Sequence, residues 1–236
     1  MAGVPVNLRD TGRSHPGRST RHLPSDRDPS RSDTRGDTRA GEDVSIRRME
    51  VVLVRHGETE WSRDARHTGR TDVPLTDEGR AQAERLRDPL GNWGFGRVLS
   101  SPLGRALDTC RLAGFGDRAE LSDPLLEWDY GEYEGETSVQ IREIRPEWNL
   151  WRDGCPRGET VADVRTRVDR LVSELKASEG DVALFSHGHV LRVFAARWVE
   201  LAPEAGARFW LATATISVLG FERETAVFRR WNAPIR

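Results

Sequence analysis

Cysteine and lysine are scarce in this sequence of 236 residues, and long apolar runs are absent. The two cysteines, Cys110 and Cys155, show neither metal-ligand spacing nor the pattern of a disulfide framework. No apolar run approaches the ~18 residues that a membrane-spanning helix needs, and the N-terminus lacks the apolar stretch of a secretory signal. We therefore expect a protein of the reducing cytoplasm with no membrane partner.

The net charge of the chain is also low. Its 36 basic residues are balanced by 38 acidic ones, so the formal net charge is −2, and nothing argues for a nucleic-acid partner. Lys176 is the one lysine, and arginine is therefore abundant along the whole chain. An arginine at any single position is weak evidence for a binding site. The length suffices for one sizeable α/β domain.

Residues 1–48 differ in composition from the rest of the chain. They contain no Phe, Trp, Tyr or Cys, and their ten arginines are interspersed with seven acidic residues. Such a segment cannot bury enough apolar surface to offset an ordering entropy of ~1–2 kcal/mol per residue. We expect a disordered, dispensable extension over residues 1–48 and a folded domain over residues 49–236, with Met49 as a natural start.

The remaining chain alternates between strand-like and helix-like segments. Val51–Val54 and Val182–Phe185 are continuous apolar runs, as expected for parallel strands buried on both faces. Residues 160–177 carry apolar side chains at helical spacing, and residues 215–221 and 225–231 indicate late strands or a hairpin. This order predicts an α/β fold with three layers, α/β/α, around a mostly parallel central sheet.

Two further segments carry helix-start signals. Thr76 can N-cap a helix that ends near Gly91. Ser101 followed by Pro102 indicates an N-cap and a first helical residue, and Arg105 would then lie in the first helical turn. A helix N-terminus favours anions through its free N–H groups and its dipole. An arginine at that end opposes the dipole and therefore suggests an anionic partner.

Two histidines stand directly after the two buried runs. His56 is preceded by Arg55 and followed by glycine, and His187 is likewise followed by Gly188. Ligands of open α/β sheets bind at the carboxyl ends of the strands, and glycine lets the backbone approach a ligand closely. A single such histidine would more often be structural. Two built alike indicate a site, and imidazole suits nucleophilic and proton-transfer chemistry near neutral pH.

A carboxylate lies in an apolar and aromatic segment further along the chain. Glu127 is embedded in residues 125–131, Leu-Leu-Glu-Trp-Asp-Tyr-Gly. Such surroundings suit a general acid. Standing alone, this residue would more often be an ordinary loop glutamate.

These segments together resemble the histidine phosphatase (phosphoglycerate-mutase-like) superfamily. The motifs that carry the resemblance follow the family's order and cover residues 50–221; they are Arg55-His56-Gly57-Glu58-Thr59, Thr68-Gly69, Asp72 through Thr76 with Gly79, Ser100-Ser101-Pro102 with Arg105, Ala106 and Thr109, Glu127 through Gly135, and Ser186-His187-Gly188-His189. The resemblance implies a phosphoglycerate-mutase-like fold, a catalytic domain over residues 49–236, and phosphoryl transfer that needs neither a metal ion nor another cofactor.

The resemblance also implies a role for each residue of the candidate site. His56 would be the phosphorylated nucleophile and Glu127 the proton donor. Arg55, Arg105 and His187 would hold the phosphoryl oxygens. The two arginines should lower the pKa of His56 and so keep it neutral and nucleophilic.

Substrate contacts are implied at the edges of the same motifs. The residues concerned are Ser62, Thr68, Gly69, Tyr130, Gly188 and Arg192. Ser62 stands where the family commonly has asparagine, so that a hydroxyl replaces an amide. Arg192 matches an arginine of the subgroup that contains sedoheptulose-1,7-bisphosphatase-like enzymes and bacterial acid phosphatases, and could meet a distal phosphate; a helix-surface arginine is the alternative. His67 and His189 are substrate contacts or neighbours of such contacts.

The family contains both phosphatases and phosphoglycerate mutases. Only about 60 residues separate Glu127 from His187, and the helix over 160–177 occupies part of them. A compact lid over residues 132–158 remains, instead of the long insert that mutases share. This favours a phosphatase acting on small phosphate esters, sugar phosphates or bisphosphates among them.

Three other readings stay open at this stage. One is a phosphoglycerate mutase of the same fold, and another is a non-catalytic module that binds phosphorylated ligands. A metallohydrolase is the third, although no cluster has metal-ligand spacing. The sequence is compatible with a homodimer.

Overall fold

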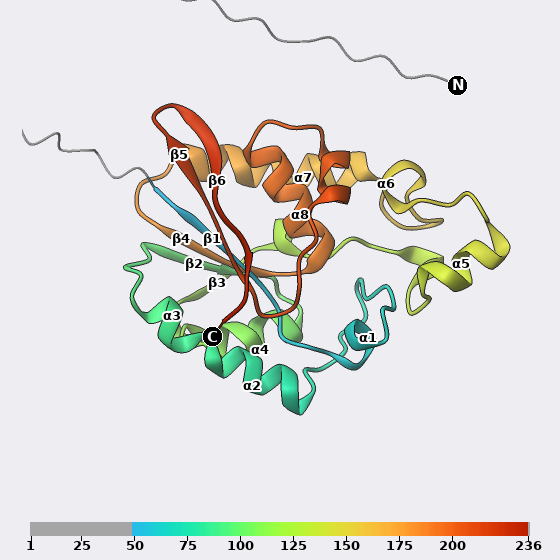
Figure 1. The fold of residues 1–236 in the computed structure, drawn as a ribbon, viewed down its shortest axis with the longest axis horizontal. Coiled ribbons are helices and arrows are strands. Elements are labelled where there is room, and N and C mark those ends of the chain that lie inside the picture. The colour runs from blue at the N-terminus through green and yellow to red at the C-terminus, as the bar shows by residue number, and fades with distance from the viewer. Residues whose placement is uncertain (1–48, 236) are drawn as a thin grey trace, which may run out of the picture. The chain divides into compact units, whose positions relative to one another are not determined.

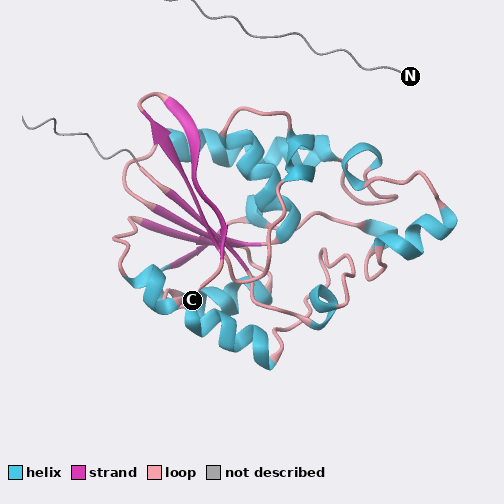
Figure 2. Cartoon of the chain, viewed as in Figure 1, coloured by secondary structure: helices cyan, strands magenta, loops and turns pink. Residues whose placement is uncertain are grey.

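The computed structural model describes residues 49–235, so the extension expected over residues 1–48 lies outside the described residues. Strands and helices alternate along the described chain (Figures 1 and 2). The strands are β1 (Val51–Arg55), β2 (Arg97–Ser100), β3 (Ala119–Leu121), β4 (Val182–Ser186), β5 (Ile216–Glu222) and β6 (Thr225–Ala233). The α-helices are α1 (Glu60–Arg63), α2 (Asp77–Arg85), α3 (Arg87–Gly91), α4 (Gly104–Leu112), α5 (Ser138–Ile144), α6 (Leu150–Asp153), α7 (Val161–Lys176) and α8 (Gly188–Trp198). Short 3-10 turns are η1 (Gly116–Arg118), η2 (Asp123–Leu125), η3 (Gly131–Tyr133) and η4 (Pro203–Arg208).

The six strands form one sheet in the order β3-β2-β4-β1-β5-β6. The neighbours among β1 to β4 pair in parallel, whereas β5 runs antiparallel to β1 and β6 antiparallel to β5. The mostly parallel sheet and the late hairpin are therefore confirmed. The two apolar runs that precede the candidate histidines, β1 and β4, are direct neighbours, and Arg55 lies opposite Ser186.

Helices cover both faces of this sheet, as Figure 1 shows. Val51 and Leu53 of β1 belong to the apolar cluster that includes residues of α7 and α8. Val52 and Val54 belong to the cluster on the other face, with residues of α4 and the α2–α3 region. Successive residues of a strand point to opposite faces of the sheet. Since all four side chains are fully buried, both faces of β1 are covered. This confirms the three-layer α/β/α architecture.

The helix starts agree with the sequence at two positions and differ at one. Thr76 caps α2 by accepting from the N–H of Gly79, as expected, and α7 begins at Val161, within the helix expected over residues 160–177. The N-cap expected at Ser101 is wrong, because α4 begins at Gly104 after an N-cap at Leu103. The Ser101 hydroxyl instead lies 2.7 Å from Nε2 of His187. The same hydroxyl accepts from the backbone N–H of Leu103 at 3.4 Å, so it makes a local bond before the helix begins as well as the bond to His187.

Residues 132–158, expected as a lid, contain α5 and α6. The capping box of Thr137 and Gln140 starts α5, and Ile141 is its buried residue. Arg66 and Thr137 form an isolated antiparallel bridge, which joins this segment to the loop after α1. Between residues 49 and 235, the helices are too short or too polar to cross a membrane.

Candidate active site

His56 and His187 leave the sheet side by side at the carboxyl ends of β1 and β4. The backbone N–H of His56 donates to the carbonyl of Ser186 at 2.9 Å, which continues the pairing of the two strands. The ring centroids of the two histidines lie 5.2 Å apart, and the ring planes are inclined by 59°. Both side chains are buried, with 4% and 0% of their surface exposed. The structure therefore brings the two sequence-predicted histidines together.

The tautomer of the His56 ring follows from the one hydrogen bond that the ring makes with the described residues. Nδ1 lies 2.7 Å from the carbonyl oxygen of Gly57, and because a carbonyl can only accept, Nδ1 carries the proton. The neutral ring then has its lone pair on Nε2. Burial lowers the pKa of His56 well below its usual value, and the charges of Arg105 and Arg55 lower it further. His56 is therefore neutral near pH 7, with an unprotonated Nε2.

His187 has hydrogen-bond partners at both ring nitrogens. Nε of Arg105 donates to Nδ1 at 3.1 Å, and since a guanidinium cannot accept, Nδ1 is unprotonated. Nε2 therefore carries the proton and donates to the Ser101 hydroxyl at 2.7 Å. Burial lowers the pKa of His187 well below its usual value, and the charge of Arg105 lowers it further. In this structure His187 is a neutral donor at Nε2.

Arg105 is fully buried and secures the loop that precedes α2. Its Nη1 donates to the carbonyl of Thr71 at 2.9 Å, and Nη2 donates to the carbonyls of Thr68 and Gly69 at 3.1 and 2.8 Å. The Asp72 carboxylate lies 3.9 Å from Nη1. The guanidinium thus already has protein partners at each nitrogen, and these partners lie too far away along the chain for a local pattern to predict them.

Arg55 has a buried donor with no partner among the residues that the structure describes. Its Nη1 donates to the carbonyl of Leu211 at 2.6 Å, whereas Nε is buried and unpartnered. An unmade hydrogen bond of this kind costs about 1–3 kcal/mol. A Cβ atom at Gly188 would lie 3.4 Å from Nε. An anion that accepted from this N–H group would remove the cost, which makes Nε a candidate ligand for an oxyanion.

The Glu127 carboxylate accepts three backbone hydrogen bonds. Its Oε1 accepts from the N–H groups of Trp128 and Val190, both at 2.9 Å, and its Oε2 accepts from that of His189 at 3.1 Å. Two of these donors belong to the first turn of α8, where the helix dipole favours negative charge. Glu127 is 4% exposed and reaches the same cavity as His56. The arrangement fixes the orientation of the carboxylate.

A cavity of about 310 Å³ lies at this edge of the sheet. Its lining includes eight of the eleven sequence-predicted site residues, namely Arg55, His56, Ser62, Thr68, Glu127, Tyr130, Gly188 and Arg192. The three predicted residues outside the lining are Gly69, Arg105 and His187. The lining also contains His67 and His189, which the sequence indicates as substrate contacts or neighbours of such contacts. The lining residues outside the prediction are Ala65, Arg66, Ser138, Trp210 and Leu211. Most of the added residues lie in loops without a distinctive motif, so no local signal marks them.

Three predicted substrate contacts are held by neighbouring protein groups. The Ser62 hydroxyl accepts from the N–H of Thr59 at 2.9 Å and donates to its carbonyl at 3.0 Å, so it serves to cap α1. The Thr68 hydroxyl donates to the carbonyl of Arg66 at 3.3 Å. Gly69 is buried, and a Cβ atom there would lie 2.7 Å from the carbonyl oxygen of Trp128. The glycine is thus required by close packing.

Tyr130 and His189 form a hydrogen-bonded pair on one wall of the cavity. The Tyr130 hydroxyl lies 2.6 Å from Nδ1 of His189. Burial raises the pKa of Tyr130 and lowers that of His189, so both groups are neutral near pH 7. Burial and the charge of Arg142 lower the pKa of His67 to about 4. The rings on this wall are therefore uncharged.

Arg192 lines the cavity and is held in place from behind. Its Nε and Nη2 donate to the carbonyls of Gly206 and Ala207, both at 2.9 Å. Its guanidinium lies 4.9 Å from the ring centroid of Trp151, a cation–π contact. Burial lowers its pKa. These contacts fix a positive charge at the cavity wall.

No group of three or more His, Cys, Asp or Glu residues within the described part of the chain is placed to hold a metal ion. The titratable residues of the cavity bond to backbone groups, as His56 and Arg192 do, or to other side chains, as Tyr130 does to His189 and His67 to Ser138. The positive charge near His56 comes from Arg55 and Arg105, whose influence lowers its pKa.

Comparison with known proteins gives consistent matches. The family model described as "Histidine phosphatase superfamily (branch 1)" matches residues 51–234. An acid phosphatase of Mycobacterium tuberculosis is 46% identical over 183 residues, which are 76% of this chain and 90% of that protein. Sedoheptulose 1,7-bisphosphatase of Saccharomyces cerevisiae is 36% identical over 182 residues, 64% of this chain and 67% of that protein. The solved structure of an open reading frame from Mycobacterium tuberculosis superposes with a TM-score of 0.76 at 44% identity, over 80% of this chain and 99% of that one.

Proposed function

Because the chain belongs to the histidine phosphatase superfamily, we propose that it hydrolyses small phosphate monoesters through a phosphohistidine on His56. The chain is a hydrolase of phosphate monoesters, as the phosphatases among its relatives indicate. The covalent route is our proposal. The observation that carries it is the hydrogen bond from Nδ1 of His56 to the Gly57 carbonyl, which leaves the lone pair on Nε2.

The first step transfers the phosphoryl group to the enzyme. The Nε2 lone pair of His56 attacks phosphorus, and the ester P–O bond breaks. Glu127, in its protonated form, donates its proton to the departing oxygen, which leaves as the alcohol. General acid catalysis of this kind contributes ~10²–10⁴ in rate. That both residues line the same cavity supports this assignment.

The second step returns the enzyme to its starting state. Glu127, now a carboxylate, accepts a proton from a water molecule whose oxygen attacks phosphorus. The P–N bond breaks, and inorganic phosphate leaves His56 with its lone pair restored. The three backbone donors to Glu127 keep the carboxylate oriented for this proton transfer.

We assign the stabilisation of the phosphoryl oxygens to three side chains. Arg55 offers its unpartnered Nε–H group. His187 exchanges its hydrogen bond to the Ser101 hydroxyl for one to a phosphoryl oxygen. Arg105 acts through its charge, and direct contact with phosphate would replace one of its bonds to the Thr68 and Gly69 carbonyls. Phosphoryl transfer depends mainly on such positioning and charge stabilisation.

The cavity supports small, polar phosphate esters, sugar phosphates among them, as substrates. Its volume of about 310 Å³ and its polar walls suit a compact hydroxylated group. Arg192 provides a fixed positive charge on the wall, which suits the second phosphate of a sugar bisphosphate. The relative named sedoheptulose 1,7-bisphosphatase is consistent with this substrate class.

The experiment that tests the proposed function is phosphate release in the presence of EDTA. Wild-type protein is assayed with sugar phosphates, sugar bisphosphates, phosphoglycerates and phosphopeptides, beside His56→Ala. We expect turnover that persists in EDTA and is lost in the variant. Full activity of His56→Ala would remove the proposal, and a preference for phosphopeptides would remove the substrate class.

A further inference from the structure

Glu127 lies in a segment with no regular secondary structure of its own. Residues 126–130 connect η2 to η3, so no strand ladder or helix fixes their backbone. The carboxylate is held by backbone donors of α8 and by its own neighbour, Trp128. A carboxyl group that delivers a proton must be placed precisely, because a misplacement of about 1 Å can cost roughly 10²-fold in rate. Something else must therefore position the backbone of Glu127.

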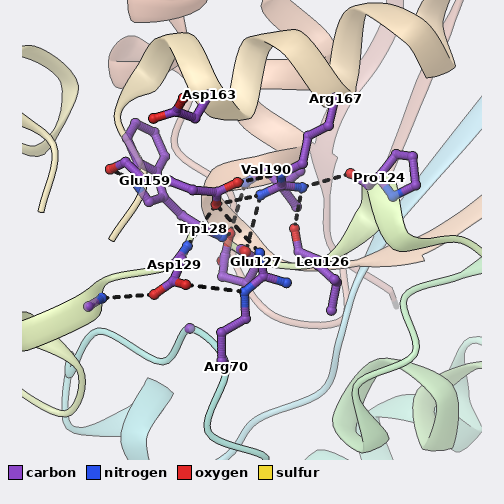
Figure 3. A network of polar contacts seen from close by, with 12 residues as sticks. Arg70, Pro124, Leu126, Glu127, Trp128, Asp129, Glu159, Asp163, Arg167 and Val190 are labelled. Atoms are coloured by element: carbon purple, nitrogen blue, oxygen red, sulfur yellow. Dashed lines mark hydrogen bonds and ion pairs between the residues drawn. The ribbon is translucent and has the colours of Figure 1, made fainter. Parts of the chain in front are cut away.

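Arg167, on α7, provides this support (Figure 3). Its Nη1 donates to the carbonyls of Pro124 and Leu126 at 2.8 and 2.6 Å. Its Nη2 donates to the carbonyl of Glu127 itself at 3.1 Å and to Oε2 of Glu159 at 3.0 Å. Its Nε donates to Oε1 of Glu159 at 2.8 Å. All five N–H groups of the guanidinium are thus matched.

Glu159 continues the support on the other side of Glu127. Its Oε2 accepts from the backbone N–H of Asp129 at 2.8 Å, and its own N–H donates to the Asp129 carbonyl at 2.8 Å. The indole N–H of Trp128 donates to the Glu159 carbonyl at 2.8 Å. Arg70 approaches the same carboxylate at 3.7 Å. Figure 3 shows Arg167 and Arg70 on opposite sides of the segment that carries Glu127 and Asp129.

From this geometry we propose that Arg167, together with Glu159, is a positioning residue for the catalytic carboxyl of Glu127. The pair is bidentate and only 17% exposed on each side chain. It fixes the carbonyls at 124, 126 and 127 and both backbone groups of Asp129. The carboxylate is then held from α8 while its backbone is held from α7. This inference rests on the proposed role of Glu127 as proton donor.

The proposal predicts a dependence on the leaving group. Para-nitrophenyl phosphate releases an acidic phenol that needs little protonation, whereas glycerol 2-phosphate releases an alkoxide that must receive a proton. kcat/KM reports on the step that breaks the ester bond, before water attacks the phosphoenzyme. Loss of the proton donor therefore lowers kcat/KM far more for glycerol 2-phosphate. A general loss of folded enzyme lowers both values equally.

The test compares four variants of the full chain on both esters. Glu127→Gln should lose about 10²–10⁴-fold on glycerol 2-phosphate and much less on the aryl ester. Arg167→Lys keeps the positive charge but removes the guanidinium that bonds to several carbonyls at once. In this variant and in Glu159→Gln, kcat/KM should fall about 10–100-fold on glycerol 2-phosphate and much less on the aryl ester. Arg165→Lys is the matched control, because Arg165 lies on the same helix in an exposed pair with Asp169. It should resemble wild type.

The outcomes separate the positioning role from the proposed function. If Glu127→Gln shows no leaving-group dependence, Glu127 is not the proton donor and the proposed function fails at that residue. If Glu127→Gln shows the dependence while Arg167→Lys and Glu159→Gln lose activity equally on both esters, or lose none, the positioning role is overturned. If Arg167→Lys lacks activity on both esters because it does not fold, the leaving-group dependence of Glu159→Gln decides whether the positioning role holds.

Discussion

The rings of His56 and His187 lie 5.2 Å apart, centroid to centroid, at the carboxyl ends of two neighbouring parallel strands. Their hydrogen bonds give them different capacities. Both ring nitrogens of His187 have protein partners, whereas the described residues engage His56 only at Nδ1. Of the two buried imidazoles, His56 is thus the one whose Nε2 is left for a substrate.

Arg55→Met is expected to raise the pKa of His56, because one of the two positive charges that lower it is removed. Burial and Arg105 remain, so the pKa should stay below 6.5. A lowered pKa keeps the nucleophile unprotonated as the pH falls, and in the variant protonation begins at a higher pH. NMR titration of the His56 ring measures this. Arg80→Met is the control, because Arg80 is exposed and its removal should leave the pKa of His56 unchanged. An unchanged His56 pKa in Arg55→Met would contradict the role of the Arg55 charge.

Arg192→Met is expected to weaken the binding of sugar bisphosphates more than that of monophosphates. A hydrogen bond to a charged group contributes about 1.5–3 kcal/mol, so KM for the bisphosphate should rise roughly 10–100-fold. Steady-state kinetics on a matched pair of sugar phosphates measures the difference. Arg208→Met, at an exposed position of η4, should leave both KM values near wild type. Equal effects on the two substrates would show that Arg192 does not meet a distal phosphate.

Gly69→Ala should destabilise the fold whether or not ligand is present. The added Cβ would lie 2.7 Å from the Trp128 carbonyl and 2.5 Å from the Glu134 carboxylate, and such overpacking costs about 1–3 kcal/mol. Gly91→Ala is the matched control, since a Cβ there meets no atom within 4 Å. Urea unfolding measures both variants. A substrate-binding defect in Gly69→Ala with unchanged stability would argue for direct contact with ligand instead.

His67 should make the stability of the protein depend on pH. Its pKa is lowered in the folded state, so between pH 6.5 and about 4 the unfolded chain binds the proton and the folded chain does not. The free energy of unfolding is therefore highest above pH 6.5, where His67 is neutral in both states, and it falls as the pH decreases toward about 4. The lowering of this pKa to about 4 corresponds to a loss of about 3 kcal/mol in the free energy of unfolding at low pH. His67→Gln, compared with wild type by urea unfolding across this range, should lose less stability on acidification; parallel curves would contradict the assignment.

The sheet and its histidines could be predicted because their signals are local. The apolar runs of β1 and β4 reflect burial on both faces, and the glycine after each histidine marks the point where the chain leaves the sheet. Thr76 signals a helix start through a bond that spans three residues, and the apolar spacing over residues 160–177 marks α7. Patterns of this range are visible in a single sequence.

The remaining features depend on contacts between distant parts of the chain. Ser101 has the signature of an N-cap, but its hydroxyl bonds to His187, 86 residues away. Arg167 looks like one of several arginines on the polar face of a helix, yet its partners include carbonyls about 40 residues earlier. Arg105 was expected beside an anion, and in the structure its donors meet loop carbonyls. No local pattern encodes these pairings.

The central claim is that phosphate is transferred to Nε2 of His56. Rapid acid-free quenching of wild-type protein during turnover of a phosphate ester, followed by peptide mass spectrometry and ³¹P NMR under alkaline conditions, tests it directly. We expect an acid-labile, base-stable phosphate on the peptide that contains His56, in the Nε2-linked isomer, and none in His56→Ala. Phosphate on another residue, phosphate on Nδ1, or continued turnover by His56→Ala would contradict it.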